Sequence, residues 1–397
     1  MRPTILLATF VALALSARAE DAVEEKDEFY PVSFGPRDFP RKVATCPAFN
    51  RADGTEIDIQ IDYVDINPDA ERTILMVHGW PSLWHSWKYQ IEEFKDDYHL
   101  LVPSLRGFGH STHPGDVESS NAMPDFVSDL VCVVEHALAA NEGKRSTQGD
   151  GKVICMGHDW GTQVCHEMAR MRPDIVEAVV ASAIPYIPSA SKPIPSSQMY
   201  MLFPGFRYQS FLARPSLAAK ELNADIRRAL RGTLRSAYSP PPKEFLNDEE
   251  SFMGAWGDVE IPPSPFLTPE EEDYWVEQYE IQGFENTLQF YTDKNRHRAW
   301  EFANKQGNHT IPQPVLSLLP SEDPVADWVL AAKLLKSEQF LPQLSPVLLK
   351  AAHWLQLERP KEFNAAVREW LKTLPPPNQV QQDAIDKSDR GHAMDEL

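Results

Sequence analysis

Short apolar runs alternate with longer amphipathic runs over most of the chain. The short runs are bounded by polar or turn-forming residues, which predicts β-strands. These predicted strands are Ile57–Ile66, Thr73–Val77, Leu100–Leu105, Val153–Met156, Val176–Ala183 and Val315–Leu319. The longer runs Phe126–Leu138 and Pro360–Leu374 are expected to be helices. Such alternation is typical of an α/β fold, a mostly parallel twisted sheet with helices on both faces.

The alternation stops near Pro185 and resumes near Pro314. The chain between them is rich in proline and aromatic residues, with a helix-like run at Ser216–Leu234 and an acidic run at Thr268–Glu280. A segment of this length is too long for a loop inside a compact domain. We therefore expect a helical lid at residues 188–312, inserted into a core formed by residues 56–187 and 313–375. Residues 20–55 are expected to be an N-terminal extension and residues 376–397 a polar disordered tail.

The two ends of the chain resemble targeting signals. Arg2, the apolar run Thr4–Leu15 and the small-residue site Ala17–Ala19 are typical of a secretory signal peptide at residues 1–19. The apolar run is shorter than the ~20 residues needed to cross a bilayer, so we expect no membrane span in the mature chain. The final Asp395–Leu397 matches retrieval signals of the endoplasmic reticulum, although Met394 replaces the usual Lys or His. The expected location is the secretory pathway, either the lumen of the endoplasmic reticulum or outside the cell.

The charge balance narrows the possible partners. The chain has 38 Lys and Arg against 58 Asp and Glu, a formal net charge of −20 at pH 7. A surface of this sign repels phosphate backbones and anionic lipids, so nucleic acid is not an expected partner. Apolar residues make up 42% of the chain, enough for a sizeable core.

The sequence does not decide which cysteines form disulfides or whether Asn308 is glycosylated. Four cysteines are too few for a disulfide framework in a chain of this length. We expect Cys155 and Cys165 to be small buried thiols, and one disulfide involving Cys132 is an alternative, with no pairing indicated for it or for Cys46. The sequon Asn308–Thr310 is either glycosylated in a luminal route or an unmodified loop.

The sharpest local motif is Gly157–Gly161, with the sequence Gly-His-Asp-Trp-Gly, between a predicted strand and a helix-like run. Small residues on both sides of a central side chain permit the strained turn called a nucleophile elbow. The central residue here is Asp159. The alternative, an aspartate that only caps the helix, does not need glycines on both sides.

A carboxylate nucleophile decides the reaction class. Attack by Asp159 on an ester or amide would form an anhydride, whereas attack on an sp3 carbon with a leaving group forms an alkyl ester. The sequence therefore predicts an alkyl electrophile, such as an epoxide or a haloalkane, as substrate and water as the second reactant.

Hydrolysis of that ester needs a base and an acid partner, which follow the nucleophile along the chain in this architecture. His353 lies shortly before the last predicted helix and is the expected base. Asp323 follows the late strand Val315–Leu319 and is the expected acid, with Glu322 and Asp327 as alternatives. The expected oxyanion donors are the backbone N–H groups of Trp80, in the turn His78–Pro81, and of Trp160.

Together these residues resemble the α/β-hydrolase-fold epoxide hydrolases. The motifs follow that family's order over roughly Asp62–Leu371: His78–Pro81, Arg106–Ser111, Gly157–Gly161, Asp323–Val325 and His353–Pro360. The resemblance implies an α/β-hydrolase fold whose helical lid encloses an apolar tunnel, hydrolysis of a small-molecule epoxide to a vicinal diol, and no metal or organic cofactor. It also matches the family's two lid tyrosines to Tyr208 and Tyr291, which would protonate the epoxide oxygen.

Two departures and two alternatives accompany this interpretation. Ala352 stands where the family usually has Gly, and Ser104 where Asp is common; neither change removes a catalytic group. A haloalkane dehalogenase would share Asp159, Asp323 and His353 but would use N–H donors for the halide, for which Trp160 is a candidate. A binding protein that kept only the fold should have lost members of the triad, yet all are present. The sequence does not indicate the oligomeric state or which epoxide is used.

Overall fold

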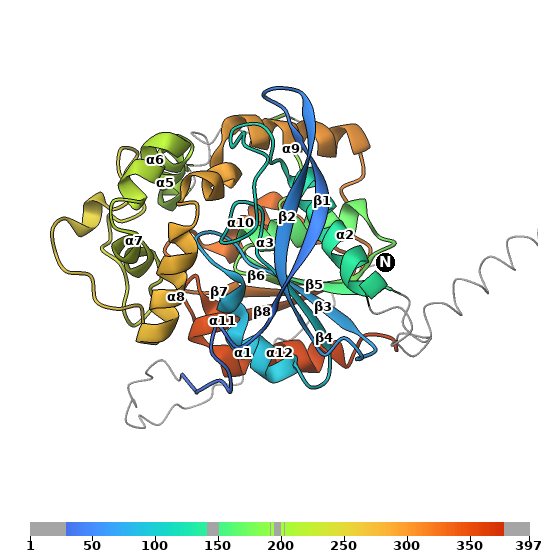
Figure 1. The fold of residues 1–397 in the computed structure, drawn as a ribbon. Helices are drawn as coiled ribbons and strands as arrows, with labels where there is room; N and C mark the ends of the chain where they lie inside the picture. Colours follow the sequence, from blue (N-terminus) through green and yellow to red (C-terminus); the bar gives the residue numbers. More distant parts are fainter. Residues whose placement is uncertain (1–28, 141–150, 191, 194–199, 202, 377–397) are drawn as a thin grey trace, which may run out of the picture.

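A computed structural model of the chain describes residues 29–140, 151–190, 192–193, 200–201 and 203–376. The expected signal peptide at residues 1–19, nearly all of the expected tail and the terminal Met394–Leu397 lie outside these described residues (Figure 1).

A single sheet of eight strands organises the described chain, in the order β1-β2-β4-β3-β5-β6-β7-β8. The strands are β1 (Arg41–Asn50), β2 (Thr55–Ile66), β3 (Thr73–Val77), β4 (His99–Pro103), β5 (Val153–His158), β6 (Val176–Ser182), β7 (Val315–Pro320) and β8 (Leu344–Leu349). Pairing is antiparallel from β1 to β2 and from β2 to β4, and parallel from β4 through β8. The predicted α/β fold with a mostly parallel sheet is confirmed.

Two strands, β1 and β8, were not indicated by the sequence pattern. Each lies at an edge of the sheet and is only partly buried, so neither forms the continuous apolar run that marks a central strand. Strand β1 lies within the expected N-terminal extension and pairs with β2 along its whole length. The central strands β3, β4, β5 and β7 are buried at every position, which is why the sequence reveals them.

Helices cover both faces of the sheet. Figure 1 shows α2 (Met123–Ala140) and α3 (Trp160–Met171) on one face and α1 (Lys88–Phe94) and α12 (Pro360–Leu371) on the other. The shorter α10 (Trp328–Leu335) and α11 (Leu355–Glu358) follow β7 and β8. Because the carboxyl ends of the parallel strands open between these layers, the loops after β3, β5, β7 and β8 meet at one edge of the sheet.

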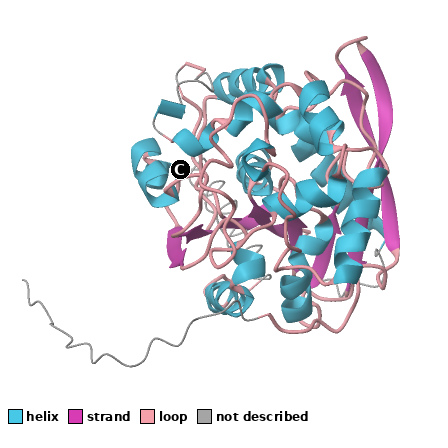
Figure 2. Cartoon of the chain, turned by 90° about the vertical axis from the view of Figure 1, so that its left-hand side faces the viewer, coloured by secondary structure: helices cyan, strands magenta, loops and turns pink. Residues whose placement is uncertain are grey.

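The expected lid at residues 188–312 contains both helices and long loops where it is described. It contains α5 (Tyr208–Leu212), α6 (Pro215–Leu222), α7 (Ile226–Thr233), α8 (Pro269–Glu280) and α9 (Asp293–Gln306), with short 3-10 helices between them. Figure 1 shows α5 to α8 gathered at one side of the sheet, the side that faces the viewer in Figure 2. No helix within the described ranges is long and apolar enough to cross a membrane.

One predicted lid helix is wrong. The run Ser216–Leu234 forms two helices, α6 and α7, because the Asp225 side chain accepts a hydrogen bond from the Arg228 N–H at 2.9 Å and starts a new helix. The acidic run Thr268–Glu280 does form a helix, α8. Thr268 and Glu271 cap it reciprocally, each side chain accepting from the other residue's backbone N–H.

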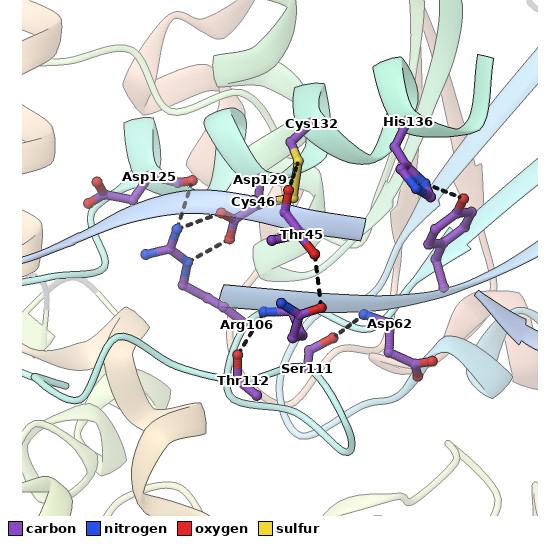
Figure 3. The surroundings of a disulfide bond; sticks show 12 residues. Thr45, Cys46, Asp62, Arg106, Ser111, Thr112, Asp125, Asp129, Cys132 and His136 are labelled. Carbon is purple, nitrogen blue, oxygen red and sulfur yellow. Dashed lines mark hydrogen bonds and ion pairs between the residues drawn. A yellow bond between two sulfur atoms is a disulfide. The ribbon is translucent and has the colours of Figure 1, made fainter. Parts of the chain in front are cut away.

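All four cysteines form disulfides. Cys46 on β1 is bonded to Cys132 on α2, with their Cα atoms 5.9 Å apart (Figure 3). Cys155 on β5 is bonded to Cys165 on α3, with their Cα atoms 5.4 Å apart. The expectation that Cys155 and Cys165 are free thiols is therefore wrong, because α3 folds back on β5 and brings their Cα atoms within bonding reach.

A buried ion pair lies close to the first disulfide. Arg106, in the loop after β4, donates from Nε and Nη2 to the two carboxylate oxygens of Asp129 at 2.6 Å each (Figure 3). Both side chains are almost completely buried. The pair ties this loop to α2, the helix that carries Cys132.

Candidate active site

Asp159 occupies the turn between β5 and α3. Its φ of 54° and ψ of −125° place it outside the backbone conformations that residues other than glycine prefer. The turn requires glycine on both sides: a Cβ at Gly157 would lie 2.4 Å from the Gly161 carbonyl oxygen, and a Cβ at Gly161 would lie 2.1 Å from that of Val77. The backbone strain is held by close packing of β5, α3 and β3, as expected for a nucleophile elbow.

The turn after β3 reaches the Asp159 carboxylate. The Trp80 N–H donates to Asp159 Oδ1 at 2.9 Å. A Cβ at Gly79 would lie 2.4 Å from the same oxygen, so only glycine allows this approach. Trp160, the other predicted oxyanion donor, is the first residue of α3, where a backbone N–H has no partner inside the helix.

His353 lies between two carboxylates. Its Nδ1 is 2.7 Å from Asp323 Oδ2, and its Nε2 is 3.6 Å from Asp159 Oδ2. Asp323 follows β7, and its buried carboxylate also accepts from the Val325 N–H at 2.9 Å and from Trp328 Nε1 at 2.6 Å. These donors hold the carboxylate in the plane in which it orients the imidazole.

The alternative acids lie elsewhere. Glu322 is one of the residues that line the cavity described below, and Asp327 caps α10 by accepting from the Leu330 N–H at 2.9 Å. The site also depends on two residues that the sequence did not single out. Trp328 donates to Asp323, and Glu358 accepts from the Ala352 N–H next to His353 at 2.9 Å. The members of each pair are close in sequence, but the way the loops after β7 and β8 fold decides that they bond.

The charge state of His353 follows from its surroundings. Burial alone would lower its pKa, but the charge of Asp323 and hydrogen bonds to Asp159 and Asp323 raise the pKa of His353 to about 10. The imidazole is therefore protonated at neutral pH. His353 and Asp159 form an ion pair in the resting site.

The lid contributes Tyr208, at the start of α5, and Tyr291, at the end of the 3-10 helix η4 (Glu285–Tyr291). Their ring centres lie 6.1 Å apart, and the Tyr291 ring lies 5.4 Å from Trp80 and 5.5 Å from Trp160. Burial raises the pKa of both phenols, and the nearby charge of Asp159 raises both further. The phenols thus stay protonated beside the carboxylate.

A cavity of about 370 Å³ lies between the lid and the ends of the strands. Asp159, His353, Trp80 and Tyr208 line it. Tyr291 is not among the lining residues, but its ring contacts those of Tyr208 and Trp80. The lid contributes Thr233, Arg235–Ala237, Pro240–Lys243, Phe245–Asn247 and Phe252 to the remaining wall. The indole of Trp80 donates from Nε1 to Thr287 in the lid at 3.1 Å. Within the described ranges, no cluster of three or more His, Cys, Asp or Glu is placed to hold a metal ion.

The sequences of related curated proteins align with most of this chain. Epoxide hydrolase A of Mycobacterium tuberculosis is 28% identical over 325 residues, which cover 80% of this chain and 95% of that protein. Bifunctional epoxide hydrolase 2 of Sus scrofa is 28% identical over 307 residues, 76% of this chain and 51% of that protein.

Solved structures are similar over the same region. Epoxide Hydrolase A from Mycobacterium thermoresistibile superposes with a TM-score of 0.67 at 25% identity, over 84% of this chain and all of that one. An epoxide hydrolase from an endophytic Streptomyces gives a TM-score of 0.68 at 25% identity, over 85% and 96% of the two chains. Residues 72–360 match the family described as alpha/beta hydrolase fold, a range that contains Trp80, the elbow, the lid, Asp323 and His353. The chain belongs to the α/β-hydrolase fold family.

Proposed function

We propose that this protein is an epoxide hydrolase that converts epoxides to vicinal diols through an alkyl-enzyme ester. One observation carries the proposal: the nucleophile at the elbow is a carboxylate, and a phenol of the lid lines the same cavity. A carboxylate selects an alkyl electrophile, and a phenol suits an oxygen leaving group that stays attached to the product. The similarity to proteins named epoxide hydrolase supports the same reaction.

In the first step, an Asp159 oxygen bonds to an epoxide carbon and the carbon–oxygen bond of the ring breaks. The electron pair goes to the ring oxygen, which receives a proton from Tyr208 or Tyr291. Because the negative charge develops only as the ring opens, the phenols stabilise the transition state more than the bound substrate. The products of this step are an ester at Asp159, a hydroxyl group on the substrate and a phenolate.

Ester formation removes the charge of Asp159, one of the causes that raise the pKa of His353. His353 then releases its proton, which restores the phenol, and becomes a neutral base held by Asp323. It takes a proton from water as the water oxygen attacks the Asp159 carboxyl carbon. The Trp80 and Trp160 N–H groups stabilise the resulting oxyanion. The ester bond breaks, and the diol oxygen takes the proton of the new carboxylic acid, so Asp159 and His353 return to their resting ion pair.

The dehalogenase alternative is less well supported by the cavity. A departing halide needs N–H donors that face it. Trp160, the candidate donor, does not line the cavity. Trp80 does line it, but its indole N–H is already bonded to Thr287. A phenol that donates its proton gives little stabilisation to a departing halide, which leaves as an anion and does not need the proton.

The direct test is turnover of the purified protein with aryl, alkyl and fatty-acid epoxides, followed by diol detection. We expect diol from at least one class, and no halide from matched chloro- and bromoalkanes. Halide release without diol formation would replace this proposal with the dehalogenase.

We further propose that the protein folds in the secretory pathway. Two disulfides are typical of an oxidising compartment and rare in the cytosol. Asn308 lies exposed in the loop after α9, where a sequon is accessible. Both features agree with the expected signal peptide.

A further inference from the structure

One arginine contacts the neighbours of both lid tyrosines. Arg296, on α9, donates from Nε to the carbonyl oxygen of Phe290 at 2.9 Å and from Nη2 to Gln209 Oε1 at 3.0 Å. Phe290 precedes Tyr291 in the chain, and Gln209 follows Tyr208. A single guanidinium therefore joins two lid segments that lie far apart in sequence and that each carry a phenol.

The same guanidinium lies over aromatic rings of the site. Its Cζ is 5.6 Å from the centre of the Tyr291 ring and 5.4 Å from that of Trp160. A cation at this distance is attracted to the face of an aromatic ring, and more strongly when the ring carries negative charge. Arg296 is therefore placed to stabilise a Tyr291 phenolate more than the neutral phenol.

Gln209 extends this effect to Tyr208. Arginine has no acceptor, so the Gln209 oxygen must face Arg296 and the Gln209 amide nitrogen must face away. That nitrogen lies 3.5 Å from Tyr208 Oη, at the long end of the hydrogen-bond range. Its N–H can only donate to the phenol oxygen, and such contacts shorten when the oxygen becomes charged.

We propose that Arg296 and Gln209 are positioning residues that stabilise the negative charge left on the phenols when the epoxide ring opens. The inference rests on the proposed function. When the phenolic proton moves to the epoxide oxygen, the electron pair of the O–H bond stays on the tyrosine oxygen. The Gln209 N–H then donates to that oxygen at Tyr208, and the Arg296 cation faces the ring at Tyr291. Neither residue touches the substrate, and neither acts in the hydrolysis step.

The test separates the two chemical steps. Single-turnover rates of ester formation and of ester hydrolysis are measured for the parent and for Gln209→Leu, which keeps the apolar stem but removes the donor. Loss of one hydrogen bond to a charged oxygen should slow ester formation roughly 10- to 150-fold and leave KM and ester hydrolysis unchanged. Arg296→Met should slow ester formation at least as much, and Arg296→Lys should recover part of the loss because it keeps the cation.

A double-variant comparison distinguishes this role from a structural one. In a Tyr208→Phe background the amide has no phenol to bond, so Gln209→Leu should cause no further loss. Arg231→Met is the matched control, since Arg231 is another lid arginine and is bonded to Glu272 at 2.7 Å, away from the phenols. It should leave both steps at the parent rate.

Three results would overturn the inference: parent rates of ester formation in Gln209→Leu, equal slowing of both steps, or a full additional loss in the Tyr208→Phe background. If the parent forms the ester normally in any of these cases, only the roles of Arg296 and Gln209 are lost. A parent that forms no ester with any epoxide refutes the proposed function and this inference together.

Discussion

His353 meets the two carboxylates of the site at different distances, 2.7 Å from Asp323 and 3.6 Å from Asp159. In the proposed mechanism, Asp323 orients the base, and Asp159 becomes the ester in the first step. Replacing His353 with Gln should therefore allow one round of ester formation and then block hydrolysis. With excess epoxide, mass spectrometry of the intact protein should find one covalent adduct, on Asp159. Diol production by this variant without an adduct would mean that water attacks the epoxide directly.

The lid phenols can be tested one oxygen at a time. Tyr208→Phe and Tyr291→Phe keep the ring packing and remove only the donor. Loss of one hydrogen bond to a charged oxygen should cost about 1.5–3 kcal/mol, or roughly 10- to 150-fold in the rate of ester formation. The double variant should be nearly inactive on epoxides, although circular dichroism should show a folded protein. Single variants that form the ester at the parent rate would identify the phenols as packing residues.

The ion pair of His353 makes stability depend on pH. The pKa of His353 is raised to about 10 in the folded protein, above the ordinary value of 6.5 for histidine. A raised pKa stabilises the fold fully below the unfolded value and progressively less as pH rises toward the folded one. The difference in unfolding free energy between the parent and His353→Gln should therefore shrink from pH 6.5 to pH 10 in urea titrations. A difference that stays constant over this range would show that His353 is neutral in the resting site.

At the scale of elements, a disulfide closes the nucleophile elbow. Cys155 on β5 precedes Asp159, Cys165 on α3 follows it, and the two are separated by only 10 residues. The other disulfide, Cys46–Cys132, spans 86 residues and joins β1 to α2 away from the site. Removing each bond in turn therefore separates an effect on the geometry of the elbow from an effect on the stability of the whole fold.

The two disulfides should rank in opposite order for stability and for the rate of ester formation. Loop-closure entropy decides the ranking by stability. Replacing both cysteines by Ala should cost about 2.7 kcal/mol for the shorter loop and about 4.6 kcal/mol for the longer one. Ester formation should be slowed only when Cys155 and Cys165 are replaced, because only that bond fixes the strand and helix that aim Asp159. Unfolding in urea and single-turnover rates measure the two effects. Equal slowing by both pairs would show that the elbow does not depend on its own disulfide.

At the scale of the whole molecule, the expected location in the secretory pathway can be tested separately from the proposed reaction. Expressed in a eukaryotic secretory host, the mature chain should begin near Glu20, and removal of Met394–Leu397 should raise the fraction found in the medium. An enzyme that removes N-glycans should increase gel mobility in the parent but not in Asn308→Gln. Secretion that is equal with and without the final residues would exclude retention, while leaving the signal peptide intact.

The central strands, the fold class and the candidate catalytic residues can be predicted from the sequence alone. The central strands are buried on both faces, so their continuous apolar runs mark them, and the fold class follows from their alternation with helices. The elbow is equally local: a carboxylate between two glycines at the end of a strand defines both the turn and the class of electrophile. The order of the triad along the chain was sufficient to predict His353 and Asp323, and the resemblance of the ordered motifs predicted the two tyrosines.

Other features depend on the tertiary structure because they join residues far apart in the chain. The edge strands β1 and β8 are held by pairing with a neighbour and not by a strong apolar pattern of their own. The Cys46–Cys132 bond exists because α2 packs beside β1, and the Cys155–Cys165 bond because α3 folds back on β5. The contact of Arg296 with Gln209 depends on how α9 and α5 meet in the lid. Local sequence determines a turn or a buried strand, but only packing decides which distant side chains become partners.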